Sequence, residues 1–276
     1  MKPEKITIRS LQEKKINKKK ITMLTAYDYP MARLVDDAGI DIILVGDSLG
    51  MVVLGYDSTL PVTMEDMIRH TQAVRRGTKH ALLVGDMPYK SYDTKEAAIA
   101  NAKRFMEEAG CDAVKLEGGT ESLEAAEIIL NSGIPVMGHL GLTPQSIEKL
   151  GGFKVQGKTA EAAKAIIEDS KKLEKVGCFS IVLECVPSAI AKIITAEVKV
   201  PTIGIGAGVD CDGQVLVTND MVGLFDRFVP KFVKQYIKLA PQILEGLLAY
   251  KKEVEDGKFP AEEHAFTIKQ EELKKI

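Results

Sequence analysis

The chain has 276 residues, of which 45% are hydrophobic, and a formal net charge of −2 from 37 basic and 39 acidic side chains. This length can fold as one large α/β domain, and the balanced charge argues against nucleic acid or an anionic membrane as a partner. The absence of an apolar leader, of a membrane-length apolar stretch and of paired cysteine spacing predicts a soluble, cytoplasmic protein of one domain, residues 1–276.

Eight short apolar runs are predicted to be strands, and segments with helical periodicity lie between most of them. The runs are 21–27, 41–47, 81–87, 113–119, 135–141, 180–186, 201–207 and 214–218. The sequence TMED at 63–66 predicts a capping box at the start of one helix, and Gly177 predicts the end of another. Because strands and helices alternate, the pattern predicts a single (β/α)8 TIM barrel.

Two short segments keep an open doubly wound sheet as the alternative. The spacing between the seventh and eighth runs is too small for an ordinary helix, and the first helix, about 30–38, is brief. Residues 1–20 are expected to form a basic N-terminal arm that is exposed and mobile, with no assigned function. Residues from about 221 to 276 are predicted to be a helical extension that packs outside the barrel or against another subunit.

Acidic side chains stand at the ends of three successive predicted strands. Asp47 and Asp86 close two apolar runs, and Glu117 follows the next. The carboxyl ends of parallel strands meet at one face, where α/β folds bind ligands. Carboxylates gathered there would raise each other's pKa, so a divalent cation such as Mg²⁺ is the simplest way to keep them ionised. A helix cap or a surface ion pair explains a single such acid equally well, but three together favour a metal site.

Three other polar residues occupy similar positions. Lys115 lies two residues before Glu117, so both side chains face one side of the strand, and its ammonium is a candidate partner for a substrate carboxylate rather than a lysine reaching for water. His139 also stands at the end of a predicted strand. A single histidine in that position is more often a structural, hydrogen-bonded group, so it is only a secondary candidate for substrate binding. Glu184 ends an apolar strand, where partial burial suits a carboxylate to accept a proton; the alternative is an acid paired with a cation.

Long motifs along residues 20–266 resemble the ketopantoate hydroxymethyltransferase family, in the order found in that family. They are TAYDY (25–29), VGDSLG (45–50), DSTLPVT (57–63), HTQAVRRG (70–77), GHLGLTPQS (138–146), VQG (155–157), LECVP (183–187), GIGAG (204–208) and PKF (230–232). The resemblance implies a TIM barrel of the phosphoenolpyruvate mutase/isocitrate lyase type. It also implies Mg²⁺ as cofactor and a decamer, a dimer of pentamers.

The activity that the resemblance implies is transfer of a hydroxymethyl group from 5,10-methylenetetrahydrofolate to 3-methyl-2-oxobutanoate, which gives 2-dehydropantoate on the pantothenate and coenzyme A pathway. The resemblance assigns roles by motif: metal binding to Asp47, Asp86 and Glu117, contacts with the 2-oxo acid to Asp47, Ser48, Asp86 and Lys115, and proton abstraction to Glu184. The 2-oxo acid, chelated to Mg²⁺, would be enolised by this glutamate and attack the one-carbon unit.

Two other classes of function were weighed against this one. A carbon–carbon lyase or mutase of the related superfamily would share the metal acids but should carry a reactive cysteine in a loop at the barrel mouth. Cys185 lies within a strand-end motif and is a poor match for that cysteine. A non-catalytic binding protein would be expected to have lost some of the acids, and all of them are present.

Overall fold

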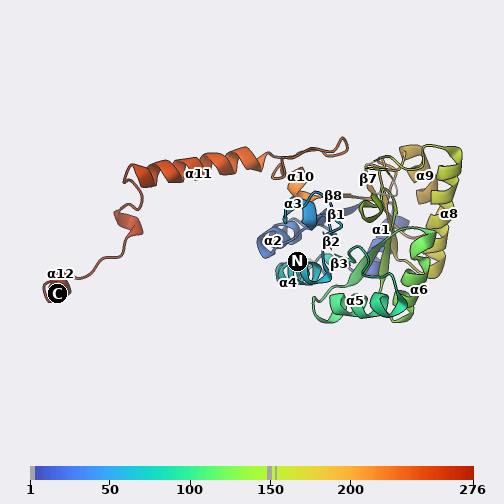
Figure 1. The fold of residues 1–276 in the computed structure, drawn as a ribbon, viewed down its shortest axis with the longest axis horizontal. Coiled ribbons are helices and arrows are strands. Elements are labelled where there is room, and N and C mark those ends of the chain that lie inside the picture. Colours follow the sequence, from blue (N-terminus) through green and yellow to red (C-terminus); the bar gives the residue numbers. More distant parts are fainter. Residues whose placement is uncertain (1–3, 148–150, 153) are drawn as a thin grey trace. The chain divides into compact units, whose positions relative to one another are not determined.

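Eight parallel strands form a closed barrel in chain order (Figure 1). The computed structural model describes residues 4–147, 151–152 and 154–276. The strands are β1 Ile21–Thr25, β2 Ile42–Val45, β3 Leu82–Asp86, β4 Ala113–Glu117, β5 Val136–Gly141, β6 Ser180–Glu184, β7 Thr202–Ile205 and β8 Gly213–Leu216. Because β8 pairs in parallel with β1, with Val215 opposite Met23, the sheet has no free edge. The predicted barrel is confirmed, and the open doubly wound sheet is excluded.

Helices lie between most of the strands, and one further helix precedes β1 and another follows β8. They are α1 Ile8–Ile16, α2 Tyr29–Asp37, α3 Leu49–Val52, α4 Met64–Gly77, α5 Lys95–Glu107, η1 Thr120–Ser122, α6 Leu123–Asn131, η2 Pro144–Ser146, α8 Ala160–Val176, α9 Ser188–Glu197 and α10 Thr218–Met221. The predicted capping box is present, since the side chains of Thr63 and Asp66 each accept the other's backbone N–H. Helix α8 ends at Gly177, which has a left-handed φ of 107°. The described segment 206–212 between β7 and β8 contains no helix, as its short length predicted.

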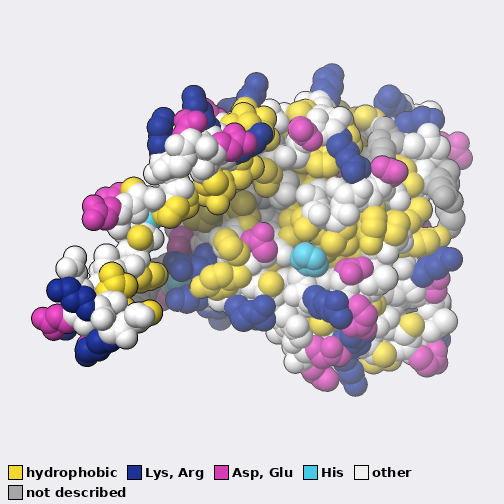
Figure 2. All heavy atoms as spheres, turned by 60° about the vertical axis from the view of Figure 1, so that its left-hand side comes forward, with side chains coloured by type: hydrophobic (Ala, Val, Ile, Leu, Met, Phe, Trp, Pro, Cys, Tyr) yellow, Lys and Arg dark blue, Asp and Glu magenta, His cyan; other side chains and the backbone are white. Residues whose placement is uncertain are grey.

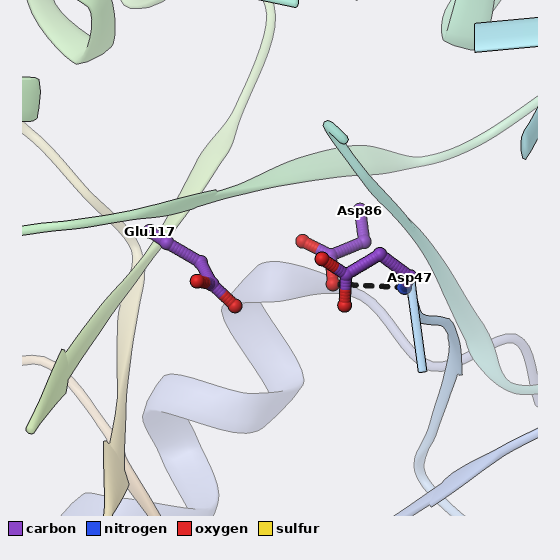
Figure 3. A group of neighbouring side chains, drawn as sticks. All are labelled: Asp47, Asp86 and Glu117. Atoms are coloured by element: carbon purple, nitrogen blue, oxygen red, sulfur yellow. Dashed lines mark hydrogen bonds between the residues drawn. The ribbon is translucent and has the colours of Figure 1, made fainter. Parts of the chain in front are cut away.

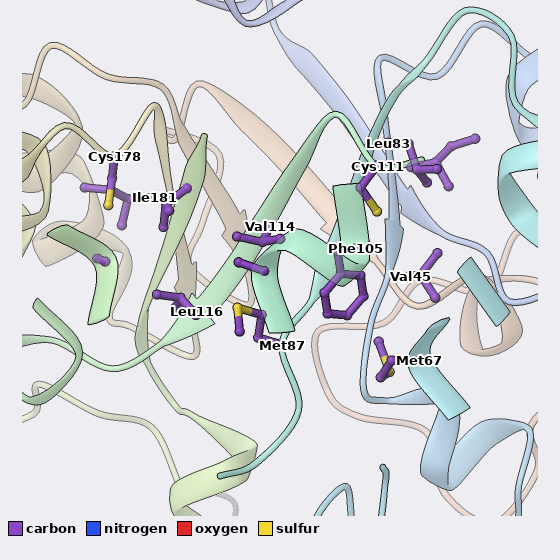
Figure 4. Close-up of a cluster of buried hydrophobic side chains, with 14 of the residues drawn as sticks. Val45, Met67, Leu83, Met87, Phe105, Cys111, Val114, Leu116, Cys178 and Ile181 are labelled. Atoms are coloured by element: carbon purple, nitrogen blue, oxygen red, sulfur yellow. The ribbon is translucent and has the colours of Figure 1, made fainter. Parts of the chain in front are cut away.

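Alternating side chains of each strand pack on opposite sides of the barrel wall. On β2, Ile42 belongs to the cluster that fills the barrel, whereas Ile43 belongs to the cluster between strands and helices. Figure 4 shows the outer cluster with the ring of Phe105, which is fully buried. This ring packs so closely on β3 that a Cβ at Gly85 would lie 2.4 Å from it. Glycine at this position therefore lets α5 support the strand that carries Asp86.

The amino-terminal residues pack against the start of the barrel and correct the expectation of an exposed arm. Helix α1 buries Leu11 completely, next to the cluster inside the barrel. Lys14 forms an ion pair with Asp41, and Lys15 Nζ lies 2.7 Å from Asp212 Oδ2. The acidic partners of these lysines lie far away in the sequence. The run of lysines therefore looked like a solvated terminus when the sequence was read alone.

A second compact unit comprises Asn219–Val229 and Lys234–Ile276. It contains α11 Leu239–Glu255, η3 Glu262–His264 and α12 Gln270–Leu273, so residues after 221 are helical as expected. Helix α11 buries none of its residues, and its large apolar side chains are exposed beside lysines and glutamates (Figure 2). Its packing against another subunit stays a prediction. Within the described residues, we find no helix with the length and hydrophobicity needed to span a bilayer.

Candidate active site

The three acids predicted as metal ligands meet at the carboxyl end of the barrel. Asp47 follows β2, whereas Asp86 and Glu117 are the last residues of β3 and β4, the next two strands of the sheet. One oxygen from each carboxylate lies within 4.8 Å of the others, and all three side chains are buried. Figure 3 shows the carboxylates turned toward one another, with the backbone N–H of Asp47 donating to Asp86 Oδ2. The position of each acid at the carboxyl end of a predicted strand was thus enough to predict that the three would meet.

Lys115 is the cation embedded among these acids. It lies on the same face of β4 as Glu117, and its Nζ is 2.7 Å from Asp86 Oδ1 and 3.5 Å from Glu117 Oε1. Burial alone would lower the pKa of Lys115, but the charges of the neighbouring acids raise it above its ordinary value. The side chain therefore carries a positive charge at neutral pH, and it can attract the carboxylate of a substrate.

One lysine does not balance the negative charge of the cluster. Burial, followed by repulsion from Asp86 and Glu117, raises the pKa of Asp47 well above its ordinary value. Burial also raises the pKa of Asp86, despite the opposing charge of Lys115. The buried Asp86 Oδ1 has Lys115 Nζ as its partner, at 2.7 Å. Buried oxygen ligands that carry excess negative charge suit a hard cation such as Mg²⁺.

His139 connects the acid cluster to Glu184. Its Nδ1 lies 3.2 Å from Glu117 Oε1, and its Nε2 lies 3.2 Å from Glu184 Oε2. Burial and the charge of Lys115 lower the pKa of His139, but the two glutamates outweigh them and raise it to about 9. The imidazole therefore orients the Glu184 carboxylate by its position between two acids.

Glu184 is more accessible than the three metal acids. Its side chain is 17% exposed, compared with 3% for Glu117, and it stands at the end of β6. Gly141 packs closely against the backbone of Glu184: a Cβ at position 141 would lie 2.1 Å from the Glu184 carbonyl oxygen. Gly141 also has a φ of +96°, which favours glycine. Leu142 N–H donates to the Glu184 carbonyl oxygen at 2.8 Å. Glu184 thus has a fixed backbone and a carboxylate that a bound molecule can reach.

All the site residues predicted from the sequence line one cavity of about 60 Å³. They are Asp47, Ser48, Asp86, Lys115, Glu117, His139 and Glu184. The Ser48 hydroxyl, at the start of α3, lies 2.8 Å from the hydroxyl of Tyr27. The remaining wall is largely apolar and includes Leu44, Val182 and Ile205. The cavity therefore offers charged groups on one side and a hydrophobic surface on the other.

Two residues that were not predicted from the sequence complete the site. Gln145 donates its Nε2–H to Asp47 Oδ2 at 2.9 Å and its backbone N–H to Glu117 Oε2 at 3.0 Å. Tyr92 donates its hydroxyl hydrogen to Gln145 Oε1 at 2.8 Å. Gln145 lies inside the GHLGLTPQS motif, which was the only signal for it, because a neutral amide in a loop carries no chemical signature of its own.

Solved structures with the same fold come from the phosphoenolpyruvate mutase/isocitrate lyase superfamily. A phosphonopyruvate hydrolase in complex with oxalate and Mg²⁺ has a TM-score of 0.60 and 13% identity, covering 97% of this chain and 93% of its own. A 2,3-dimethylmalate lyase of that superfamily has a TM-score of 0.59 and 12% identity, covering 94% of this chain and 88% of its own. At such low identity these similarities show the fold alone, and they confirm the predicted type of barrel.

Sequence relatives are much more similar. The 3-methyl-2-oxobutanoate hydroxymethyltransferase of Syntrophomonas wolfei is 59% identical, covering 99% of both chains, and that of Heliobacterium modesticaldum is 56% identical, covering 97% of this chain and 98% of its own. The family described as ketopantoate hydroxymethyltransferase matches residues 5–262. The chain therefore belongs to the ketopantoate hydroxymethyltransferase family.

Proposed function

We propose that this protein transfers a hydroxymethyl group from 5,10-methylenetetrahydrofolate to 3-methyl-2-oxobutanoate, giving 2-dehydropantoate for pantothenate and coenzyme A synthesis. The observation that carries the proposal is the convergence of three buried carboxylates, Lys115 and Glu184 on one cavity. The family resemblance adds Mg²⁺, a cytoplasmic location and assembly as a homodecamer, a dimer of pentamers. Its partners would be small molecules and further copies of the chain, with neither nucleic acid nor membrane.

The substrate's polar end fits the charged side of the cavity. Asp47, Asp86 and Glu117 would hold Mg²⁺, which when bound supplies Lewis-acid stabilisation of negative charge on the substrate oxygens. The ammonium of Lys115, kept charged by its acidic neighbours, neutralises the carboxylate of the 2-oxo acid. The Ser48 hydroxyl, held by Tyr27, lines the same cavity and orients that end of the substrate.

Glu184 acts on the C3 proton of the bound 2-oxo acid. His139 holds the carboxylate at the end of β6, and the apolar wall around Val182 and Ile205 receives the branched alkyl group of the substrate. The C3 proton passes to Glu184, and C3 of the resulting enolate forms a bond to the methylene carbon of the opened folate iminium. The bond between this methylene carbon and the folate nitrogen then breaks: water supplies a hydroxyl group to the carbon and a proton to the nitrogen, and tetrahydrofolate leaves. A base positioned in this way contributes about 10² to 10⁴ in rate.

Proton NMR of 3-methyl-2-oxobutanoate in D₂O tests the proposal. With the protein and Mg²⁺, the C3–H signal should disappear before any folate is added, because enolisation precedes transfer. Addition of 5,10-methylenetetrahydrofolate should then produce 2-dehydropantoate. A folded, metal-loaded protein that causes neither exchange nor product formation would overturn the proposal. Exchange without transfer would contradict the folate step and favour a lyase or mutase reaction.

A further inference from the structure

Gln145 contacts two of the three acids of the metal cluster through two different donors. Its side-chain amide reaches Asp47 and its backbone N–H reaches Glu117, while Tyr92 supports the amide from behind. We propose that Gln145 and Tyr92 form a positioning pair that holds these acids in the arrangement that binds the metal. This inference rests on the proposed Mg²⁺ site and adds two residues to it.

The hydrogen bonds allow only one orientation of the Gln145 amide. Its Nε2 donates to Asp47 Oδ2 and to the carbonyl oxygen of Met87, at 2.9 and 3.0 Å. The Met87 carbonyl oxygen can only accept, so turning the amide over would lose that bond and bring two oxygens together. The Oε1 atom must then accept the hydroxyl hydrogen of Tyr92, whose other partner, the Glu117 carbonyl oxygen, is farther away at 3.3 Å. Every donor and acceptor of the side chain is therefore used.

The pair orients the acids without neutralising them. Lys115 brings a positive charge that competes with a metal ion, whereas an amide and a phenol bring only dipoles. Gln145 occupies one oxygen of Asp47 and one of Glu117, so each carboxylate keeps a second oxygen for other partners. Partners of this kind fix the direction of metal ligands, and their removal typically lowers metal affinity about 10- to 100-fold.

Hydrogen bonding rather than dense packing holds the pair in place. Gln145 is 6% exposed, yet a cavity of about 270 Å³ borders both Gln145 and Tyr92. A side chain next to such a space is not fixed by close contacts on that side. The bonds to Asp47, Glu117 and Met87 therefore determine where the amide lies, and the Tyr92 hydroxyl determines how it is turned.

Titration with Mn²⁺ followed by electron paramagnetic resonance, in the presence of 3-methyl-2-oxobutanoate, measures the metal site without turnover. We expect Gln145→Leu, which keeps the size of the side chain, to weaken Mn²⁺ binding about 10- to 100-fold. Tyr92→Phe keeps the ring and removes one neutral hydrogen bond, so we expect a loss of about 2- to 10-fold. The double variant should bind no more weakly than Gln145→Leu, because the shorter bond of Tyr92 goes to Gln145 and its contact with Glu117 is to the backbone, not to the carboxylate. Gln72→Leu, which removes a single bond to the Glu108 carbonyl oxygen, is the matched control and should bind as wild type.

Steady-state kinetics separate positioning from loss of structure. In Gln145→Leu the Mg²⁺ concentration for half-maximal rate should rise with the loss of affinity, while the rate at saturating Mg²⁺ falls much less. Wild-type affinity in both folded single variants would overturn the inference and leave the proposed function standing. Losses that simply multiply in the double variant would overturn the pairing of the two residues. A wild-type protein that binds no Mn²⁺ would overturn the metal site itself and this inference with it. If Gln145→Leu does not fold, Tyr92→Phe alone decides.

Discussion

Three acids at one end of the barrel and the three-acid cluster at the other end have opposite charge environments. At the amino ends of the strands stand Asp41, Asp112 and Asp212; at the carboxyl ends stand Asp47, Asp86 and Glu117. Each acid of the first set is paired with its own lysine, whereas the three acids of the second set share Lys115 and, at Glu117, His139. The comparison shows that local charge balance, rather than the presence of carboxylates, separates a structural site from a functional one.

Two of the three amino-end acids follow one repeated pattern. Asp212, just before β8, accepts the backbone N–H and the hydroxyl hydrogen of Thr202 on β7, at 2.9 and 3.1 Å, and pairs with Lys15. Asp41, just before β2, makes the same two bonds to Thr22 on β1 and pairs with Lys14. Charge-assisted bonds of this kind satisfy both charges and tie adjacent strands together. This end of the barrel therefore contributes to stability.

At the carboxyl ends, the acids face one another instead of separate partners. The pKa of Asp47 and that of Asp86 are raised, mainly by burial. Such an arrangement destabilises the metal-free fold and is typical of a site that keeps its charge for a ligand.

The largest effect on the rate of proton exchange is expected at Glu184, because this carboxylate is proposed to accept the C3 proton but not to bind the metal. Glu184→Gln keeps the size of the side chain but cannot remove the C3 proton, so exchange in D₂O should slow by about 10² to 10⁴. Mg²⁺-dependent binding of 3-methyl-2-oxobutanoate, measured by calorimetry, should stay close to wild type. Full proton exchange in this variant would remove Glu184 from its proposed role.

The same chemical change at the two ends of the barrel should have opposite consequences. Asp86→Asn should abolish the calorimetric signal of Mg²⁺ and substrate binding, while the metal-free protein melts at or above the wild-type temperature, because repulsion is relieved. Asp212→Asn should lower the free energy of unfolding by about 1 to 3 kcal/mol, since it weakens charge-assisted bonds to Lys15 and Thr202. Its Mg²⁺ affinity should be unchanged. Unchanged metal titration in Asp86→Asn would contradict the ligand assignment.

The pH dependence of the Mg²⁺ effect gives a third comparison. Because the folded-state pKa of Asp47 and that of Asp86 are raised, each binds a proton more tightly in the folded chain than in the unfolded one. Their protonated forms stabilise the metal-free fold at low pH, and this contribution is lost as the pH rises through the raised pKa values. Mg²⁺ competes with these protons, so its stabilising effect should increase with pH.

Differential scanning fluorimetry with and without Mg²⁺, at a series of pH values above the ordinary aspartate range, measures this difference. The increase in melting temperature caused by Mg²⁺ should grow with pH in the wild type. Asp86→Asn should show almost no increase at any pH, and Asp212→Asn should follow the wild-type curve from a lower starting point. An Mg²⁺ effect that is constant across the series would show that the acids do not take up protons when the metal is absent.

The sequence predicted the carboxyl end of the barrel better than the amino end, for a physical reason. Asp47, Asp86 and Glu117 each follow an apolar run, and parallel pairing brings the ends of such runs together without further information. Side chains two residues apart in a strand face the same side, so the placement of Glu117 at the site also placed Lys115 there. Each step used only local pattern and the topology of the fold, and the resemblance to a family then supplied the reaction.

The ion pairs of helix α1 and the hydrogen bonds of Gln145 could not be predicted from the sequence, because their partners are distant along the chain. Lys15 and Asp212 are 197 residues apart, so nothing near α1 indicated that its lysines are paired. Gln145 is 98 residues from Asp47, and an amide shows no preference in sequence between a loop surface and a buried bond to a carboxylate. Long-range hydrogen bonds of this kind become visible only when the barrel has closed.

The smallest effect is expected from removing one lysine at the amino end. Lys15→Met keeps most of the side-chain length but loses the charge next to Asp212, which still accepts two hydrogen bonds from Thr202. The exposed fraction of both partners is near 15%, so we expect a loss of about 1 kcal/mol and a melting temperature lower by about 2 to 4 °C. Lys19→Met, a change at an exposed lysine close by in the chain, is the control and should melt as wild type. Because the matched acids hold the strands and not the substrate, the rate of C3 proton exchange should be the same in both variants; a slower rate in Lys15→Met would show that the two ends of the barrel are coupled.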